Sequence, residues 1–545
     1  MKKNRKLIIY FIVVTILFAV MGWFASVPIN PFLSDSILYF TAYLFFIALG
    51  ILGSEGISSF TSVLQGGHFY YNKKKLIVSV CLVGIPILYL IIMNILGLPI
   101  FNTDAYKNQI GKIEVKEFTD DIQPLDVSQL PVVDLDLASK LADKKLGEKP
   151  ALGSQVHLGE PTIQTVNGKL VWVVPLQHSG FFKWITNLEG TPGYIVVSAT
   201  DPKDVSYVDN YKIKYQPDSY FAQNLTRHVR FGKGLTNGLT DYSFELDDSG
   251  KPYWVVTTYK NSRFMALPEA TGVIIVDAQT GEQQEYNLNE VPEWVDRVQP
   301  RSFMMQQINN RGNYIHGVFN FSNKDKFKTS DLSNVVYNNG ECYLFTGITS
   351  IASDEATTGF MMVNLKTKHV IQYNIGGATE EAAQRSAEGK VQNLGYEASY
   401  PIMTNVNGTP TYFMTLKDKS GLIKQYAFVS VKDYTSVGNG ETAESALLNY
   451  QQLIQGSSDA VIEDQTNVKV QEGTIERIAP EVQGQTTIYK IILKEIPDKI
   501  FTASSNLSDE LALSEVSDKV SIRYYETQEP VINAIAFDNL QFTQK

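Results

Sequence analysis

Several residue types that mark familiar functions are scarce in this sequence. Its 545 residues include two cysteines, too few for a disulfide scaffold or a cysteine-rich zinc site. Lysine and arginine (47) are outnumbered by aspartate and glutamate (57), and the net charge of -10 argues against a nucleic-acid-binding protein. Glycine (38) and proline (21) are near average, which excludes collagen-like and low-complexity chains.

The motifs of the common enzyme classes are also missing. The six histidines form no H-E-x-x-H or H-x-x-E-H pattern, and the chain has no G-x-S-x-G elbow, P-loop or G-x-G-x-x-G. Cys342 falls in a predicted strand, where a thiol behaves as a small buried hydrophobe. We therefore predict no catalytic residue, no metal site and no cofactor.

Charged residues are absent from three long stretches near the N-terminus. Leu7–Phe24, Ile37–Gly53 and Leu76–Ile100 each reach the roughly 17 to 25 apolar residues that cross a bilayer. We predict three transmembrane helices within residues 1–100 and a juxtamembrane segment at 101–130. A cleavable signal peptide is the alternative for the first stretch, although its 18 residues are long for a signal-peptide core.

Basic residues are unevenly distributed around these stretches. Residues 1–75 carry seven basic and two acidic side chains, whereas the rest of the chain carries 40 basic and 55 acidic ones. By the positive-inside rule, the N-terminus is cytoplasmic and the large C-terminal region is extracytoplasmic. With a single exported cysteine, the composition favours a multi-pass protein of the cell membrane of a Gram-positive bacterium.

The exported part carries a weak internal repeat in which a turn pair precedes an aromatic or β-branched strand. The four pairs are Asn167-Gly168, Ser249-Gly250, Asn339-Gly340 and Asn407-Gly408. Four residues after each glycine stands a large side chain: Trp172, Trp254, Leu344 or Tyr412. Helical patterns such as Leu137–Gly147 alternate with these strands, so we predict an α+β fold with helices packed on small antiparallel sheets.

The spacing of the repeat divides the exported part into modules. We place four repeat modules at residues 131–215, 216–310, 311–395 and 396–456. After a polar linker, five short predicted strands in residues 468–545 indicate a small β-barrel, which we expect to be OB-like.

The second module ends its long hairpin in VIIVDAQTGEQQEY, where Asp277, Thr280 and Gly281 form a D-x-x-T-G turn. Over roughly residues 130–455 the chain resembles PepSY-type modules, which end in a strand, such a turn and a further strand. Asn364 and Thr367 match the turn in part, and the first and fourth copies depart from it. PepSY-type modules occur in exported and membrane-anchored bacterial proteins. The resemblance therefore implies a binding or regulatory role and no catalytic residue.

An aromatic insert in the first module is the candidate interface. Phe181, Phe182 and Trp184 lie between two predicted strands, where a connection is normally polar, and Phe264 and Met265 occupy the equivalent stretch of the second module. These side chains either cover the edge of the sheet or form an exposed apolar patch that meets lipid or a partner. The sequence leaves both interpretations open.

These features predict a non-enzymatic, membrane-anchored extracytoplasmic protein that acts as an interaction scaffold or regulatory subunit of a cell-envelope complex. Its expected partners are the lipid bilayer and a membrane or envelope protein or a second copy of itself, with no nucleic acid. Two alternatives are a ligand-binding receptor or sensor of the envelope and an unrecognised envelope hydrolase. Three spans exceed what an anchor needs, which favours a partner within the membrane.

Overall fold

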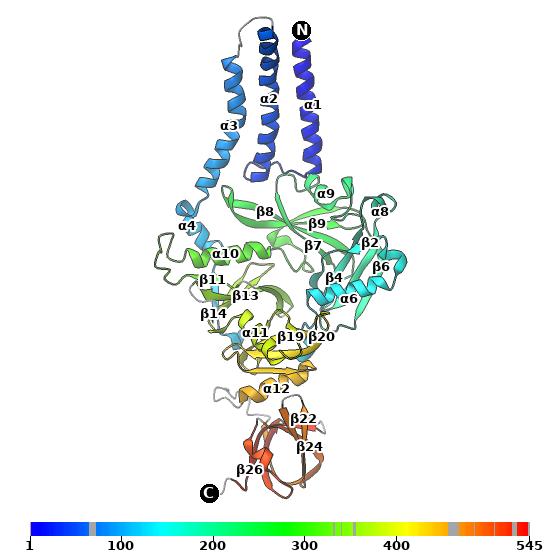
Figure 1. The fold of residues 1–545 in the computed structure, drawn as a ribbon, viewed down its shortest axis with the longest axis vertical. Helices are drawn as coiled ribbons and strands as arrows, with labels where there is room; N and C mark the ends of the chain where they lie inside the picture. The colour runs from blue at the N-terminus through cyan, green and yellow to red at the C-terminus, as the bar shows by residue number, and fades with distance from the viewer. Residues whose placement is uncertain are drawn as a thin grey trace.

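The computed structural model describes residues 2–64, 72–330, 333–338, 340–351, 356–455, 468–483, 486–505, 507–525 and 531–542. Figure 1 shows three parts along its long axis: apolar helices, a broad mixed body and a small β structure near the C-terminus. The coarse fold prediction, α+β with N-terminal apolar helices and several sheets, is confirmed. The predicted linker at 456–467 and Asn339 of the third turn pair lie outside the described residues.

Three long helices carry the apolar stretches: α1 (Lys2–Phe24), α2 (Ser34–Leu64) and α3 (Lys73–Leu96). Each contains a segment long and apolar enough to cross a membrane, so the three predicted apolar helices are confirmed. The third helix ends at Leu96 rather than Ile100, because Pro99 has no N–H to continue the helical bonds, holds Leu98 in an extended conformation and starts a new helix. That helix is α4 (Pro99–Asn108).

Among the described residues, four sheets make up the body (residues 99–455). The first contains β2 (Val156–Leu158), β3 (Thr162–Val166), β4 (Lys169–His178), β5 (Thr191–Ser198) and β6 (Val205–Ile213), and the second β7 (Gly238–Leu246), β8 (Pro252–Arg263), β9 (Ala266–Asp277) and β10 (Gln283–Asn287). The third contains β1 (Ile113–Lys116), β11 (Phe327–Thr329), β12 (Asn334–Asn338), β13 (Glu341–Ser350), β14 (Ala356–Asn364), β15 (Val370–Tyr373) and β16 (Gly377–Ala378). The fourth contains β17 (Glu397–Ala398), β18 (Ile402–Val406), β19 (Thr409–Lys417), β20 (Ile423–Ser430) and β21 (Val437–Gly440).

Equivalent residues occupy equivalent places in the four sheets. The large residue four positions after the turn glycine pairs with a valine of the next strand in every copy: Trp172 with Val197, Trp254 with Val276, Leu344 with Val363 and Tyr412 with Val429. In every copy that next strand ends on a polar residue whose side chain accepts backbone N–H bonds from the following turn. These residues are Ser198, Asp277, Asn364 and Ser430. The four hairpins therefore share one register.

A helix precedes each sheet: α6 (Leu135–Gly147), α9 (Leu225–Phe231), α10 (Arg301–Asn313) and α11 (Glu380–Lys390). Ahead of each helix, a backbone N–H bonds the carbonyl just after the capped strand: Val133 to Ala199, Tyr215 to Ala278, Gln299 to Leu365 and Ala378 to Val431, at 2.7 to 3.0 Å. The helices α10 and α11 thus pack on the sheets that follow them, whereas the predicted modules 216–310 and 311–395 include them at their C-terminal ends.

Neighbouring modules share their apolar cores. Val171 and Val173 of the first sheet pack with Phe244 of the second, and Tyr343 of the third packs in one cluster with Met414 of the fourth. The second sheet buries its other face against Val295 and Val298, the segment that leads into α10. Phe413 and Phe428 of the fourth sheet belong to the same cluster as Leu137 of α6. The contacts therefore run from module to module and return to the first.

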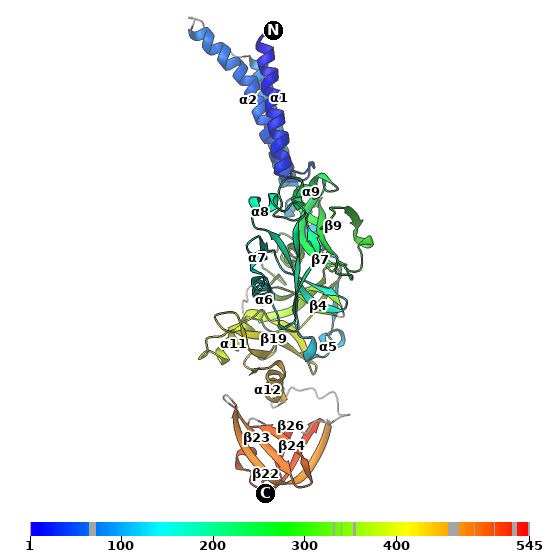
Figure 2. The same ribbon diagram turned by 90° about the vertical axis from the view of Figure 1, so that its right-hand side faces the viewer.

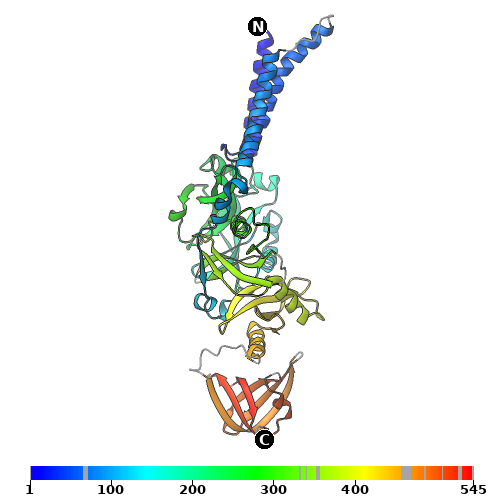
Figure 3. The ribbon, with the colours of Figure 1, turned by 90° about the vertical axis from the view of Figure 1, so that its left-hand side faces the viewer.

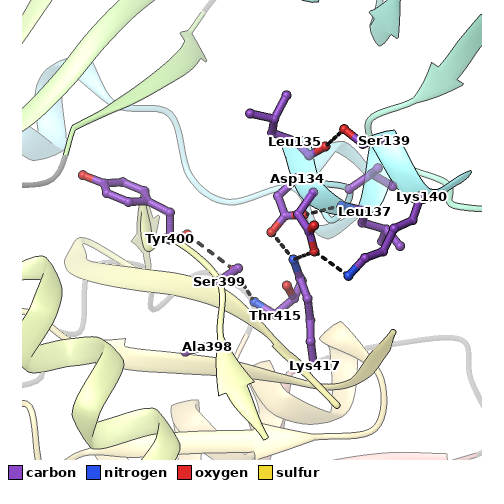
Figure 4. Close-up of polar contacts among 12 residues, drawn as sticks. Asp134, Leu135, Leu137, Ser139, Lys140, Ala398, Ser399, Tyr400, Thr415 and Lys417 are labelled. Atoms are coloured by element: carbon purple, nitrogen blue, oxygen red, sulfur yellow. Dashed lines mark hydrogen bonds and ion pairs between the residues drawn. The ribbon is translucent and has the colours of Figure 1, made fainter. Parts of the chain in front are cut away.

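An ion-pair network marks the return from the fourth module to the first (Figure 4). Lys417 at the end of β19 points at the N-terminus of α6, where its ammonium pairs with Asp134 and lies 3.8 Å from Asp136. Asp136 also pairs with Lys140 one helical turn later, at 2.9 Å. Asp134 is in addition the N-cap of α6 and accepts the Leu137 N–H at 3.0 Å. One carboxylate thus stabilises both the helix end and the contact between modules.

Residues 113–133, named here the strap, run across three modules. Strand β1 pairs in parallel with β15 of the third sheet. After α5 (Phe118–Asp121), Leu125 donates its N–H to the Asn405 carbonyl of the fourth module at 2.9 Å. The strap then reaches the first module through the Val133 bond. Much of the predicted juxtamembrane segment 101–130 is accordingly part of the body.

The remaining helical elements lie outside this repeated pattern. They are α7 (Pro150–Gly153), α8 (Phe181–Ile185), α12 (Ala443–Gln455) and the 3-10 turns Val127–Gln129, Phe221–Gln223, Leu288–Glu290 and Asp509–Leu513. Helix α12 covers the fourth sheet, where Tyr450 stacks on Phe428.

Five strands follow at the end of the molecule opposite the spans (Figures 2 and 3). They are β22 (Val468–Gln483), β23 (Thr486–Leu493), β24 (Ile496–Ser504), β25 (Lys519–Tyr525) and β26 (Val531–Asn539). They pair in the order β22-β23-β24-β26-β25, and the first half of β22 pairs with β25. Their core, which includes Ile475, Phe501 and Phe537, contains no residue of the body.

Candidate functional site

The second module forms the end of the body that meets the spans (Figure 1). Two arginines on α9 bond the backbone where α1 ends. Arg227 donates to the carbonyls of Trp23 and Phe24, each at 3.1 Å, and Arg230 donates to Ser26 at 3.0 Å. The last carbonyls of a helix lack partners within the helix and carry its negative dipole end, so guanidinium donors suit this position. The N-cap Asn224, which accepts the Arg227 N–H, fixes where α9 begins.

The loop between α1 and α2 is bonded to the same module. The Ile29 N–H bonds the Leu235 carbonyl at 2.9 Å, and the Asn30 amide bonds the Thr236 carbonyl at 2.7 Å. Asn261 of β8 donates to the Phe32 carbonyl at 3.0 Å. These bonds are directed at the backbone, so they hold the loop in one orientation over the second sheet.

The tip of the β8–β9 hairpin contacts the third span. The Asn94 amide lies 3.8 Å from the sulfur of Met265, and a Cβ at Gly97 would lie 3.2 Å from that of Ala266. Phe264 forms the turn with a φ of 54°, in the left-handed region. The predicted interface residues Phe264 and Met265 are thus half-buried at the base of α3 rather than on a free surface.

The predicted aromatic insert folds as α8, and the structure separates its three aromatic residues. Trp184 is 6% exposed, and its indole N–H donates to Gln223 at 2.7 Å. Phe181 is half-buried between Trp184 and Tyr220. Phe182 is 79% exposed. Trp184 is therefore part of the packed interior beside the sheet edge, whereas Phe182 is on the surface.

A continuous series of ring contacts joins α8 to the end of the first span. Phe24 contacts Phe221 at 6.1 Å, Phe221 contacts Trp184 at 5.7 Å, and Trp184 contacts Phe181 at 5.7 Å. Phe181 in turn contacts Phe182 at 5.7 Å. We name these five residues the aromatic strip. Because Phe24 and Phe221 are far apart in the sequence, no local pattern could have joined them to the insert.

A second polar cluster joins three modules inside the body. The Tyr337 hydroxyl donates to the Ile163 carbonyl and lies 3.0 Å from Asp296, which accepts the Thr165 N–H at 2.8 Å. Near them, Glu245 is fully buried, and its Oε2 has no hydrogen-bond partner. Burial raises the pKa of Glu245 to about 7, with Arg297 and the Ser243 hydroxyl acting in the opposite direction.

The hydrogen bonds of this cluster hold the first, second and third modules together. Burial also raises the pKa of Cys342 to about 12, so its thiol is protonated at neutral pH and is a poor nucleophile. Within the described part of the chain, no group of three or more His, Cys, Asp or Glu residues is arranged to hold a metal ion.

Comparisons with known proteins give little guidance. No protein-family model matches the chain, and no curated protein matches it. Among solved structures, a levansucrase of B. megaterium aligns at 10% identity over 76% of this chain and 97% of that chain, with a TM-score of 0.17. A levansucrase of B. subtilis aligns at 8% identity over 76% and 96%, with a TM-score of 0.19. Likenesses of this size carry no argument about fold or function.

Proposed function

We propose that this protein is a non-enzymatic, membrane-anchored scaffold or regulatory subunit of a cell-envelope complex. Its N-terminus lies in the cytoplasm and its body lies outside, in a Gram-positive bacterium. The observation that supports this most directly is the attachment of the body to all three spans. Arg227 and Arg230 bond the end of α1, Asn261 bonds the start of the α2 segment, and Met265 contacts α3.

Such an attachment differs from a simple tether. An anchor for one domain needs a single span and tolerates a flexible linker, whereas here the loop between α1 and α2 is bonded to the second module. A body held in this way presents its surface at a set height and rotation above the membrane. A partner that packs on the spans and a partner that binds the body would then be held in fixed register.

Two family assignments belong to this proposal. The modules are of the PepSY type, which is supported by the turn caps Ser198 and Ser430, since they occupy the place of Asp277 in copies whose sequences depart from D-x-x-T-G. The C-terminal unit is an OB-like barrel, which is supported by the strand order β22-β23-β24-β26-β25 and by the parallel pairing of β24 with β26.

The orientation is tested with intact protoplasts. Added protease should remove the body while the N-terminal tail and the loop before α3 stay protected. Digestion of the body only after lysis would show the opposite orientation and would end the proposal of an extracytoplasmic scaffold.

The scaffold role is tested by purifying the full chain from native membranes in mild detergent. We expect a membrane protein at fixed stoichiometry with the wild type and a reduced amount with Arg227→Ala, which loosens the body from α1. The matched control is Arg263→Ala, on the hairpin tip, whose guanidinium donates to the carbonyl of its neighbour Ser262. A wild-type protein that purifies without a stoichiometric partner, or with a bound small molecule in native mass spectrometry, would contradict a scaffold, and the second result would favour a receptor.

A further inference from the structure

We propose that the exposed side chains of α8, positioned by the aromatic strip, insert into the lipid headgroup region beside the spans, so that the body contacts the bilayer peripherally as well as through its helices. The occupant of this apolar surface is the phospholipid bilayer itself. The inference rests on the proposed function only in requiring a membrane-anchored chain, and it is independent of the side on which the body lies.

The position of the strip follows from its continuity with a span. Phe24 is the last residue of α1 and of the segment long enough to cross the membrane, so it lies where hydrocarbon gives way to headgroups. From Phe24 the ring contacts pass through Phe221 and Trp184 to α8, each at 6.1 Å or less. Figures 1 and 2 place α8 and α9 at the end of the body nearest the spans. The strip is thus held at the level of the interface by its own fold.

The exposed side chains of this region suit lipid. Phe182 is 79% exposed, and Ile185 and Leu188, three and six residues later, are each 47% exposed. Lys183 stands beside Phe182 with its own side chain exposed, as in peripheral segments that place a cation among phosphates and apolar groups below them. Exposed aromatic rings are also the groups that favour the interfacial layer.

Side-chain hydrogen bonds hold the segment that carries these exposed residues, so it is not a flexible loop. Gln223 accepts the Trp184 indole N–H at 2.7 Å and donates its amide to the Leu188 carbonyl at 3.0 Å. One side chain therefore ties both ends of the segment to the second module. Phe182 and Ile185 are therefore exposed on a segment that is held in place. An apolar surface of this kind is best covered by a partner that is always present beside the end of α1. Lipid meets that requirement without a further protein.

The test uses the full chain in phosphatidylcholine proteoliposomes that contain no other protein, with bromine on the lipid acyl chains near the headgroups. Phe182→Trp should show a loss of tryptophan emission beyond that of the wild type, because bromine quenches an indole within a few ångströms. The matched control is Tyr434→Trp. Tyr434 is 51% exposed and belongs to the fourth module, which lies away from the spans. This variant should add emission that the lipid does not quench.

A second pair of variants separates surface from core. Phe182→Ser with Ile185→Ser should leave the melting temperature unchanged and increase amide exchange of residues 180–188 in proteoliposomes. Trp184→Ser should lower the melting temperature, because that side chain is buried. If Phe182→Trp is quenched no more than Tyr434→Trp in pure lipid, the inference is overturned, and a protein occupant takes its place. Quenching in pure lipid supports it even when no scaffold partner is found, so failure of the two proposals can be told apart.

Discussion

At the scale of single residues, Asp277 shows how one turn cap supports the repeat. Its Oδ1 accepts the N–H groups of Gln279 and Thr280 at 2.8 and 3.0 Å, and its Oδ2 pairs with Lys251 at 2.6 Å. We expect Asp277→Ala to lower the free energy of unfolding by about 2 to 3 kcal/mol, because it leaves two turn N–H groups without their acceptor and removes the ion pair with Lys251. Thermal unfolding of the full chain measures this.

The matched control for that change is provided by the third module. Asn364 occupies the same place, accepts the equivalent N–H bonds at 2.9 and 2.8 Å and donates to Glu341 at 3.0 Å. Asp277→Asn should therefore retain the turn and lose only the ion pair, so its effect should be the smaller one. Equal losses for both substitutions would show that the ion pair with Lys251, and not the turn, determines stability there.

Glu245 gives a prediction about pH. Its pKa in the folded protein is raised to about 7 by burial, above its ordinary value of 4.5, so between these values the folded state holds a proton that the unfolded state has lost. Stability should fall as the pH rises through this window, by about 3 kcal/mol for the full shift. Glu245→Gln should lack that fall.

The pH dependence of stability has to be compared between the wild type and Glu245→Gln, because other buried carboxyl groups nearby titrate as well. Burial also raises the pKa of Asp296 and of Asp241, so the wild type and the variant share those contributions. Urea unfolding between pH 5 and pH 8 checks the difference. A variant that loses stability as steeply as the wild type would show that Glu245 stays ionised across the range.

Single residues could be predicted from the sequence where they departed from a local pattern. Residues whose role depends on contacts with distant parts of the chain could not. Phe181, Phe182 and Trp184 were found because aromatics are unusual in a hairpin connection, but nothing local predicted that one would be buried and another exposed. The arginines of α9 sit at ordinary helical spacing. Only the fold brings them to the end of α1.

At the scale of elements, the strap is the segment whose structural role the sequence did not predict, since it packs on the body and not beside the membrane. Phe118 of α5 is 5% exposed and packs edge-on against Tyr373 of the third sheet, with ring centroids 5.7 Å apart. We expect Phe118→Ala to cost about 3 to 5 kcal/mol in the free energy of unfolding and to make residues 113–133 more sensitive to protease.

Val115 supplies the control for the strap. It lies on β1, pairs with Gln372 and is 58% exposed, so Val115→Ala removes apolar surface that is already in water. Limited proteolysis with mass spectrometry should show faster cleavage of the strap for Phe118→Ala alone. Equal cleavage of both variants and the wild type would mean that β1 pairing holds the strap without Phe118.

Element boundaries followed the sequence where caps and apolar runs agreed and departed where they did not. The spans and α6 were predicted closely, because long apolar runs and the helical apolar spacing of Leu137–Gly147 have few alternative interpretations. The apolar spacing of Val291–Gln307 also predicts a helix, but the helix there is α10, Arg301–Asn313. Pro300 stands at its N-cap, and Val295 and Val298 upstream lie in irregular chain, where they are buried against the second sheet. The apolar residues of this segment have helical spacing and pack on the second sheet, although the backbone is not helical.

At the scale of the whole molecule, shared cores predict how the protein unfolds. Each sheet of the body packs into a cluster that also contains a neighbouring module, and the fourth returns to the first through Phe413 and α6. The five C-terminal strands have a separate core around Phe501. Because cooperative units follow contiguous packing, the body should melt in one transition and the C-terminal unit in another.

Two substitutions of the same kind test this division by calorimetry of the full chain in detergent. Phe413 is 1% exposed and Phe501 is fully buried, so each change to alanine should cost about 3 to 5 kcal/mol within its own unit. Phe501→Ala should lower only the transition of the C-terminal unit. Phe413→Ala should lower the body transition as a whole and reduce amide protection in α6, although the substituted residue lies in the fourth module. If α6 keeps its protection while the fourth sheet loses its own, the contacts between these modules are too weak to couple them, and the body unfolds module by module.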